Sequence, residues 1–270
     1  MPHRPLSRIA GDKFREINAF WRDTRTPMAL TLDTLRLKSA PFVAVSSDAI
    51  KLQLRPRAGE SFTFYENLVR RDYLAHGIRL GPGDTVVDIG ANIGAFVVLA
   101  ASTVGPSGRV IAFEPVSATF ERLQANVALN GFGNVQACRE GVEAEDGTIS
   151  IQLGTKSALA SAHGLIDGEA TRVETAPCLS MQHLFERHGI ARIHLLKIDC
   201  EGGEHGIFRS LTPELAGRID QIAMEAHPVA GESIEALAER LDALGFAVGR
   251  TGMNWVAFNR RRSMPNGLPQ

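Results

Sequence analysis

Thr85-Val-Val-Asp-Ile-Gly-Ala-Asn-Ile-Gly94 is the stretch that decides the fold of this chain. Its apolar residues before Gly90 predict a short buried strand, and Gly90 and Gly94 predict a turn into the apolar run that begins at Ala95. A strand, a glycine turn and a helix in this order bring backbone N–H groups and a helix N-terminus up to a nucleotide-like ligand.

The spacing of the glycines separates this turn from a dinucleotide-binding loop. That loop has glycines at its first, third and sixth positions, which here are Gly90, Asn92 and Ala95. An acid, Asp88, stands two residues before the first glycine, and we expect its carboxylate to point at the ligand. A carboxylate favours a cationic ligand such as S-adenosylmethionine (SAM), which carries a sulfonium and an ammonium group. The alternatives are an ordinary tight turn with a capping Asp, or an NAD oxidoreductase, with which Asn92 and Asp88 conflict.

Composition limits the classes of protein to consider. The chain has 270 residues, 44% hydrophobic and 22% charged, with a formal net charge of −1. These values are normal for a packed globular protein and show no basic excess for nucleic acid. We predict no signal peptide, no membrane span and a cytoplasmic location. The odd number of cysteines, Cys138, Cys178 and Cys200, predicts free thiols.

Residues 1–80 read as an N-terminal cap of helices and a hairpin. Apolar residues at helical spacing predict a helix around residues 14–21 and a second one over 28–37. Residues 42–54 predict a hairpin, and 65–75 a further helix. The cap is either pure scaffold or a wall of the substrate pocket.

Residues 81–260 alternate between predicted strands and helices, which is typical of a mostly parallel sheet with helices on both faces. Gly81-Pro-Gly-Asp84 breaks the chain before the first core strand. We predict further strands at 109–114, 135–140, 194–199 and 221–225, a hairpin arm at 148–153, a loop over 154–176, and a closing antiparallel hairpin at 246–248 and 255–258. Residues 261–270 are predicted to be a flexible tail.

Acidic residues follow four of the predicted strands, namely Asp88, Glu114, Asp199 and Glu225. In open α/β sheets, ligands lie outside the C-terminal ends of the strands. Acids gathered there raise one another's pKa, so they favour a cationic or hydroxyl-rich ligand. Any one of these acids alone could simply cap a helix, but four together are harder to explain that way.

Glu114 lies at the distance from the glycine turn at which a ribose-binding acid is expected. One carboxylate accepts two hydrogen bonds, so we expect Glu114 to bind both ribose hydroxyls of an adenosyl group. Asp199 and Glu201 lie at a second strand-to-helix corner, and His227 follows Glu225 by two residues. A histidine there could take a proton from a substrate hydroxyl, or it could simply bond a neighbouring carboxylate.

Four motifs together give the chain a family resemblance: Val87-Asp-Ile-Gly-Ala-Asn-Ile-Gly94, Ala112-Phe-Glu-Pro115, Leu196-Lys-Ile-Asp-Cys-Glu-Gly-Gly-Glu204 and Met224-Glu225. Over residues 60–260 the chain resembles the FkbM family of class I SAM-dependent methyltransferases. The first motif marks only the superfamily, whereas the third is specific to the family. Its members mostly methylate hydroxyl oxygens of sugars, polyketides and other secondary metabolites.

The resemblance implies a Rossmann-like seven-stranded sheet whose last strand is antiparallel. It implies that the methionine part of SAM lies near Asp88, Gly90, Asn92 and Gly94, and the ribose at Glu114. It places adenine near Glu143, although Gly141-Val-Glu143 departs from the family's usual Ala-Leu-Ser, and it likens residues 157–161 to an active-site loop. We also predict that Asp199 contacts SAM. The family has no universally required metal, and none is predicted.

The leading hypothesis is therefore in-line transfer of the SAM methyl group to an oxygen of a small molecule. His227 is the first candidate for the base, with Asp199 and Glu201 behind it, and a carboxylate acceptor would need no base. The alternatives keep SAM but replace methyl transfer, either by intramolecular cyclisation that releases methylthioadenosine or by binding without catalysis. A homodimer is possible through the leader or the closing hairpin.

Overall fold

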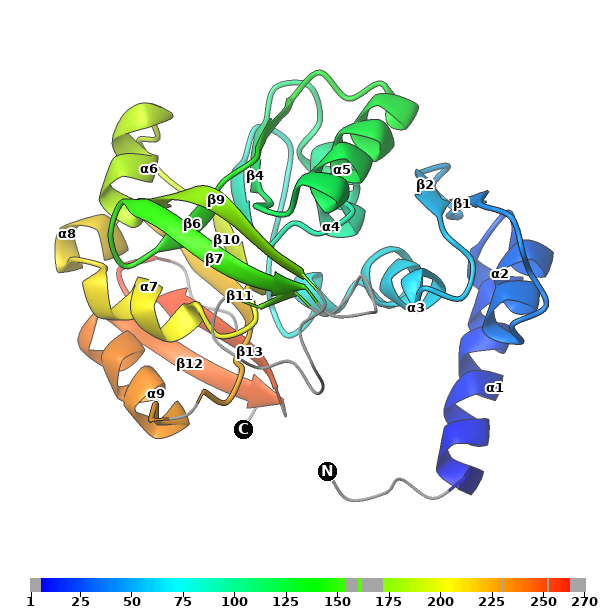
Figure 1. Cartoon of the computed structure of the whole chain (residues 1–270). Coiled ribbons are helices and arrows are strands. Elements are labelled where there is room, and N and C mark those ends of the chain that lie inside the picture. The colour runs from blue at the N-terminus through cyan, green and yellow to red at the C-terminus, as the bar shows by residue number, and fades with distance from the viewer. Residues whose placement is uncertain (1–5, 154–159, 162–171, 230, 252, 263–270) are drawn as a thin grey trace.

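The centre of the fold is a seven-stranded sheet of mixed direction (Figure 1). It is seen in a computed structural model that describes residues 6–153, 160–161, 172–229, 231–251 and 253–262. From one edge to the other the strands are β12 (Phe246–Thr251), β13 (Asn254–Asn259), β11 (Gln221–Glu225), β10 (Leu195–Ile198), β3 (Thr85–Ile89), β4 (Arg109–Phe113) and β5 (Val135–Cys138). β13 runs antiparallel to both of its neighbours, β11 and β12, and the other pairs of adjacent strands in this sheet are parallel. The expected α/β sheet with an antiparallel last strand is confirmed.

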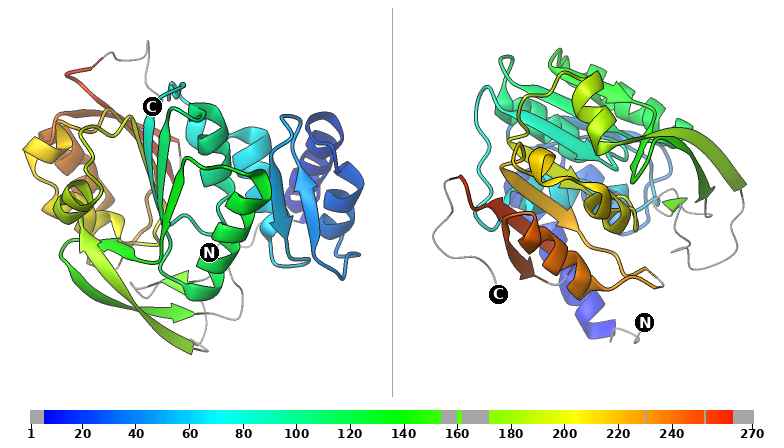
Figure 2. Two further views of the ribbon diagram at one scale, coloured as in Figure 1. Left: turned by 90° about the horizontal axis from the view of Figure 1, so that it is seen from above. Right: turned by 90° about the vertical axis from the view of Figure 1, so that its left-hand side faces the viewer.

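Both faces of the sheet are covered by helices (Figure 2, left). Successive residues of a strand point to opposite faces, so Val87 packs with α6 (Met181–Arg187), α7 (Glu204–Ser210), α8 (Pro213–Ala216) and α9 (Ile234–Ala243). Val86 packs on the other face with α4 (Ala95–Val104) and α5 (Ser117–Asn130). This two-sided burial explains why the central strands are runs of apolar residues rather than alternating patterns.

A second sheet lies beside the first, and the sequence predicts only part of it. It has the order β6 (Gly141–Glu143), β9 (Arg172–Ser180), β7 (Gly147–Leu153) and β8 (Ala160–Ser161). β7 pairs with β9 along its whole length, so the hairpin arm is confirmed. The predicted loop is wrong from Arg172 onwards, because that segment becomes a strand through pairing with β7, from Leu153 opposite Arg172 to Gly147 opposite Cys178.

The N-terminal segment packs against α4 through its own apolar cluster. Its elements are α1 (Leu6–Asp23), α2 (Pro27–Thr34), β1 (Phe42–Val45), β2 (Lys51–Leu54), α3 (Glu60–Phe64), the π-helix η1 (Tyr65–Arg70) and the 3₁₀ turn η2 (Asp72–Leu74). Phe20, Leu52 and Phe64 are fully buried in a cluster that includes Leu99 of α4. The two helices and the hairpin are confirmed, whereas the single helix predicted over 65–75 is two shorter pieces, η1 and η2, broken at Arg71 with φ 57°. A boundary after residue 80 stays a prediction.

Several apolar side chains of this segment remain exposed. Phe14 and Trp21 on α1 are 66% and 55% exposed. The homodimer that would cover such a surface stays a prediction. Cys138, Cys178 and Cys200 are free thiols, as expected. Among the helices that the structure describes, none is both long and apolar enough to cross a membrane.

Candidate active site

A pocket opens where the strand order reverses, at the C-terminal ends of β3, β4 and β10. Such a switch point is the usual ligand site of open α/β sheets. The pocket holds about 800 Å³ of empty space, part of it open to solvent. Backbone and side chains of three loops line it, together with β6 and β7 of the second sheet. Its polar lining residues include Asn92, Glu114, Thr119, Glu140, Glu143, Asp199 and Glu201.

Gly90 lets two loops approach closely at the floor of this pocket. Its φ is +77°, and a Cβ built on it would lie 1.9 Å from the carbonyl oxygen of Asp199. Asn92 and Glu201 also have left-handed backbones, with φ of 50° and 53°. Such conformations persist only where the surrounding structure enforces them, and they concentrate at functional sites.

Replacing Gly90 by alanine is expected to lower the free energy of unfolding by at least about 3 kcal/mol, because a side chain adds an overlap with backbone to the left-handed strain. Urea unfolding followed by circular dichroism measures this. Gly131→Ala is the matched control, since Gly131 has φ +69° but a Cβ at that position would meet nothing within 4 Å. That control isolates the backbone strain, about 1–2 kcal/mol. Equal losses in the two variants would contradict the close approach.

Glu114 ties the loops after β3 and β4 together while its carboxylate lines the pocket. Its Oε2 accepts the N–H of Asn92 at 2.9 Å and its Oε1 accepts the N–H of Val116 at 3.0 Å. Burial raises the pKa of Glu114 to about 7, against the lowering effect of these two hydrogen bonds. A carboxylate oxygen has two lone-pair sites, so each oxygen can still accept a hydroxyl from a ligand.

Asp88 has a different orientation from the one that the sequence suggested. Its side chain is fully buried and its Oδ1 lies 3.0 Å from the Nζ of Lys197, the residue beside it on β10. Lys197 also donates to the carbonyl of Gly90 at 2.8 Å. Burial opposes the charge of Lys197, but Asp88 and Asp199 outweigh it and raise the pKa of Lys197. The carboxylate of Asp88 therefore faces a lysine beneath the pocket, and contact with SAM stays a prediction.

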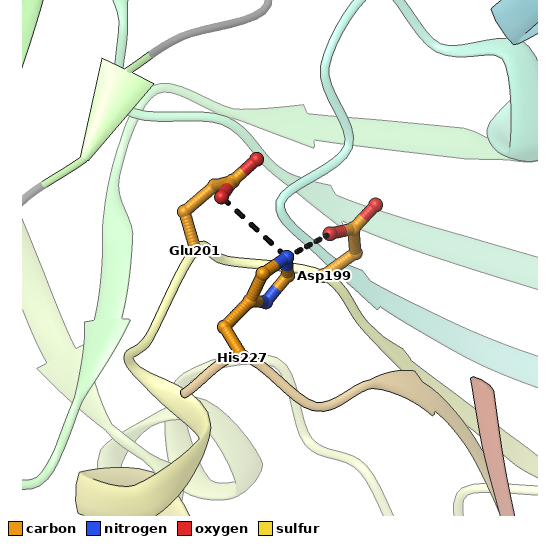
Figure 3. Close-up of side chains that lie close together, drawn as sticks. All are labelled: Asp199, Glu201 and His227. Atoms are coloured by element: carbon orange, nitrogen blue, oxygen red, sulfur yellow. Dashed lines mark ion pairs between the residues drawn. The ribbon is translucent and has the colours of Figure 1, made fainter. Parts of the chain in front are cut away.

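Three side chains meet at the other end of the pocket, where β10 and β11 end (Figure 3). The Nε2 of His227 lies 3.5 Å from an oxygen of Glu201 and 4.0 Å from the Oδ1 of Asp199. Asp199 and Glu201 also line the pocket. The sequence predicted these residues as neighbours because parallel strands end at one edge of a sheet, and the structure brings them together.

The imidazole of His227 is held from behind by a buried acid. Its Nδ1 lies 3.0 Å from the Oε1 of Glu204, whose side chain is fully buried at the start of α7. Burial alone would lower the pKa of His227, but the hydrogen bond to Glu204 and the surrounding negative charge raise it to about 9. In this arrangement His227 holds a proton at neutral pH. That is unfavourable for the predicted role of a base, which needs a free lone pair.

Two residues of the N-terminal segment reach this site, and sequence analysis missed both. The hydroxyl of Tyr73 donates to the Oδ2 of Asp199 at 2.8 Å. Glu66, on the π-helix, has its pKa raised to about 8 by burial and by the nearby acids Asp72, Glu225 and Asp199. The segment therefore contributes to the wall of the site. A π-helix often marks a functional site, but no pattern in the sequence distinguishes it from an α-helix.

The remaining predicted site residues divide between lining and packing positions. Gly90, Asn92 and Glu143 line the pocket. Gly94 does not, since a Cβ there would meet the side chain of Leu123, 2.6 Å away, so its place is in helix packing. Glu225 is the last residue of β11, beside His227. The loop likened to an active-site loop, 157–161, lies outside the described residues apart from the two of β8.

Chemically, the pocket combines a buried carboxylate near a glycine turn with a cluster of two acids and a histidine. Gly90 and Glu114 provide close backbone approach and a hydroxyl-binding carboxylate. Asp199, Glu201 and His227 each offer one N or O atom, and these atoms lie within 4.8 Å of one another. Such a set can hold a proton, a hydroxyl group or a metal ion.

Comparison with known proteins gives a matching family model and several similar proteins. The family model described as "Methyltransferase FkbM domain" matches residues 88–248. The chain is 31% identical over 250 residues to the 31-O-demethyl-FK506 methyltransferase FkbM of Streptomyces tacrolimicus, covering 82% of this chain and 91% of that protein. It is 29% identical over 203 residues to Methyltransferase 1 of Beauveria bassiana, covering 65% and 77% of the two chains.

A solved structure of the same description is also similar. Methyltransferase FkbM from Methylobacillus flagellatus superposes with a TM-score of 0.48 at 15% identity, over 92% of this chain and 60% of that one. The matching region of the family model contains the glycine turn, Glu114 and the whole cluster around His227.

Proposed function

The chain belongs to the FkbM methyltransferase family, and we propose that it transfers the methyl group of SAM to a hydroxyl oxygen of a small molecule. Because it belongs to this family, the chain is a SAM-dependent methyltransferase. The observation that carries the finer proposal is the acidic cluster of Asp199, Glu201 and His227 at the open end of the SAM pocket. The name of the Streptomyces relative, a 31-O-demethyl-FK506 methyltransferase, supports the choice of oxygen.

The residues of the pocket fit SAM. Gly90 lets the loop after β3 approach the backbone of Asp199 closely at the pocket, where a Cβ would clash with that backbone. Glu114 presents a carboxylate that can accept both ribose hydroxyls, and Glu143, which also lines the pocket, is proposed for the adenine. Asn92 belongs to the loop that Glu114 holds in place through the Asn92 N–H. We propose these residues and Asp199 as the cofactor contacts, with Asp88 and Gly94 supporting the turn from beneath through Lys197 and Leu123.

The reaction needs orientation more than covalent help. SAM supplies an electrophilic methyl group: the S–CH₃ bond breaks with its electron pair left on sulfur, and an O–CH₃ bond forms. The hydroxyl proton leaves to a basic group or to solvent. Holding reactants in line can supply about 7–11 kcal/mol. We propose that Asp199, Glu201 and His227 hold the acceptor oxygen beside the pocket, while Tyr73 fixes the carboxylate of Asp199.

The affinity for SAM is expected to fall as the pH drops below about 7. The ribose hydroxyls favour ionised Glu114, so binding lowers the pKa of that carboxyl from its value of about 7 in the free protein. The contribution of ionised Glu114 to SAM affinity is complete above about pH 7. Below that pH it is lost, and the Kd of SAM rises by up to about tenfold per pH unit. Calorimetric titration with SAM from about pH 8 to about pH 5.5 measures this. Glu114→Gln should remove that part of the pH dependence, and an unchanged profile in this variant would contradict the assignment.

The test of the proposed function is product analysis by mass spectrometry. The purified protein is incubated with SAM, with and without a fractionated cell extract as the source of acceptor. We expect S-adenosylhomocysteine that requires the extract, and little of it from the Glu114→Gln variant. Methylthioadenosine formed without extract would show that the protein cyclises SAM instead of transferring its methyl group. SAM binding with neither product from any fraction would indicate a protein that binds without catalysis. Neither alternative is supported by the relatives.

A further inference from the structure

We propose that Asp199, Glu201 and His227 bind one divalent cation, which holds an oxygen of the methyl acceptor beside the SAM pocket. The proposal rests on the proposed function for the role of the acceptor, but the cation site itself stands on the geometry of the three side chains. It adds to the sequence-based expectation, which included no metal.

The three side chains have the chemistry and the spacing of a mixed nitrogen and oxygen site (Figure 3). Two ligands of one ion can be at most about twice a metal–ligand distance apart, or roughly 4–5 Å. The Nε2 of His227 is 3.5 Å from Glu201 and 4.0 Å from Asp199, and all three ligand atoms fall within 4.8 Å. A cation at their centre would need only small side-chain movements, and it would displace the proton that His227 otherwise holds.

Groups outside the cluster aim two of the three ligands at its centre. Glu204 holds the Nδ1 of His227, which turns Nε2 toward the carboxylates, and the side chain of His227 is only 9% exposed. Tyr73 holds the Oδ2 of Asp199, which leaves Oδ1 on the side of His227. A carboxylate behind a histidine and a hydrogen bond behind a carboxylate are the usual supports of metal ligands. Simple surface clusters lack such supports.

The charge around the cluster also favours a cation. Glu201, Glu204 and Asp199 all lie within 4.0 Å of the imidazole of His227. Glu225 lies close enough to interact with Asp199 and His227 electrostatically. Lys197 also lies near the cluster, but its Nζ is 3.0 Å from Asp88 and 3.9 Å from Asp199, so its charge is shared with another acid. Repulsion among these carboxylates decreases when a divalent ion binds between them.

Three protein ligands leave open positions on the cation. Ions that accept carboxylate and imidazole ligands often have six positions. Two adjacent open positions suit an acceptor that offers two neighbouring oxygens, such as a vicinal diol, and one of these oxygens would receive the methyl group. The bonds that break and form in methyl transfer are the same with the cation as without it. It fixes the acceptor oxygen and stabilises its negative charge as the proton leaves.

The experiment is a titration with MnCl₂ followed by electron paramagnetic resonance, in which the free ion gives the signal and the bound ion does not. The protein is first treated with chelator and dialysed. We expect one tight Mn²⁺ site per chain, weakened more than about 100-fold in His227→Gln and about 10–100-fold in Glu204→Gln. Glu201→Gln, at a half-exposed position, serves if His227→Gln does not fold. His183→Gln is the matched control, because His183 pairs with Asp146 on another surface at 3.2 Å.

Absence of a stoichiometric Mn²⁺ site in the wild-type protein, or equal binding by wild type and Glu201→Gln, would overturn the proposal. Product analysis with chelated protein separates this failure from failure of the function. Loss of S-adenosylhomocysteine on chelation, restored by MnCl₂, supports the cation. Full production by chelated protein rejects the cation and leaves methyl transfer intact.

Discussion

Replacing Glu114 by glutamine is expected to raise the Kd of SAM about 100-fold or more. A hydrogen bond to a charged acceptor contributes about 1.5–3 kcal/mol, and the variant loses the charge from two of them. The amide also places an NH₂ group against one of the N–H donors of Asn92 and Val116, which the carboxylate accepts at 2.9 and 3.0 Å. Calorimetric titration at about pH 8 measures the change, because Glu114 is then ionised in the wild type.

The control for this variant is Glu174→Gln. Glu174 also accepts a backbone N–H, that of Ser117 at 2.9 Å, but it does not line the pocket. It should bind SAM like the wild type while losing a comparable structural hydrogen bond. If Glu114→Gln binds SAM within threefold of the control, Glu114 holds the loops and takes no part in binding the ribose.

Replacing His227 by glutamine is expected to lower the rate of methyl transfer by at least about 100-fold, with little change in the Kd of SAM. Loss of precise orientation of a reactant costs about 10²-fold. His227 lies beside Glu201 and Asp199, at 3.5 and 4.0 Å, in the cluster that we propose holds the acceptor. The release of S-adenosylhomocysteine at saturating SAM, with the active extract fraction as acceptor, measures the rate.

A decrease of less than about tenfold for a hydroxyl acceptor would remove His227 from the acceptor site. His183→Gln again provides the control for loss of a histidine, since His183 is exposed and pairs with Asp146 outside the cluster. Normal SAM binding by the His227 variant shows that the fold and the cofactor pocket are intact. The comparison therefore assigns the loss to the acceptor side.

The parts of the fold that could be predicted from sequence depend on local patterns. The run before Gly90 is apolar because β3 is buried on both faces, and the glycine with φ +77° marks the turn. Glu114 and Asp199 could be placed together because each follows a parallel strand. The residues specific to the family, from Leu196 to Glu204, lie on β10 and the corner before α7.

The parts that were missed depend on contacts between distant residues. Tyr73 contacts Asp199, which is 126 positions away in the chain. No sequence pattern around Tyr73 indicates that contact. The strand at Arg172–Ser180 exists because β7 pairs with it. Asp88 was expected to face the ligand, but Lys197 lies beside it on β10 and pairs with its carboxylate.

The same distinction applies to His227. The sequence places a histidine near two acids, which is enough to suggest a base. The buried Glu204 behind its Nδ1 is visible only in three dimensions, and it raises the pKa of His227 to about 9 together with the other carboxylates. Position in the fold was therefore predictable, whereas protonation was not.

The most direct measurement of the central claim follows the methyl group itself. The protein is incubated with SAM carrying a deuterated methyl group and with the extract fraction that supports turnover, and the acceptor is analysed by mass spectrometry before and after alkaline hydrolysis. We predict a product that gains one labelled methyl group, retains it through alkali as an ether does, and forms together with S-adenosylhomocysteine. A label lost in alkali would identify a carboxylate acceptor, and methylthioadenosine without a labelled acceptor would show that SAM is not a methyl donor here; either result contradicts methylation of a hydroxyl oxygen.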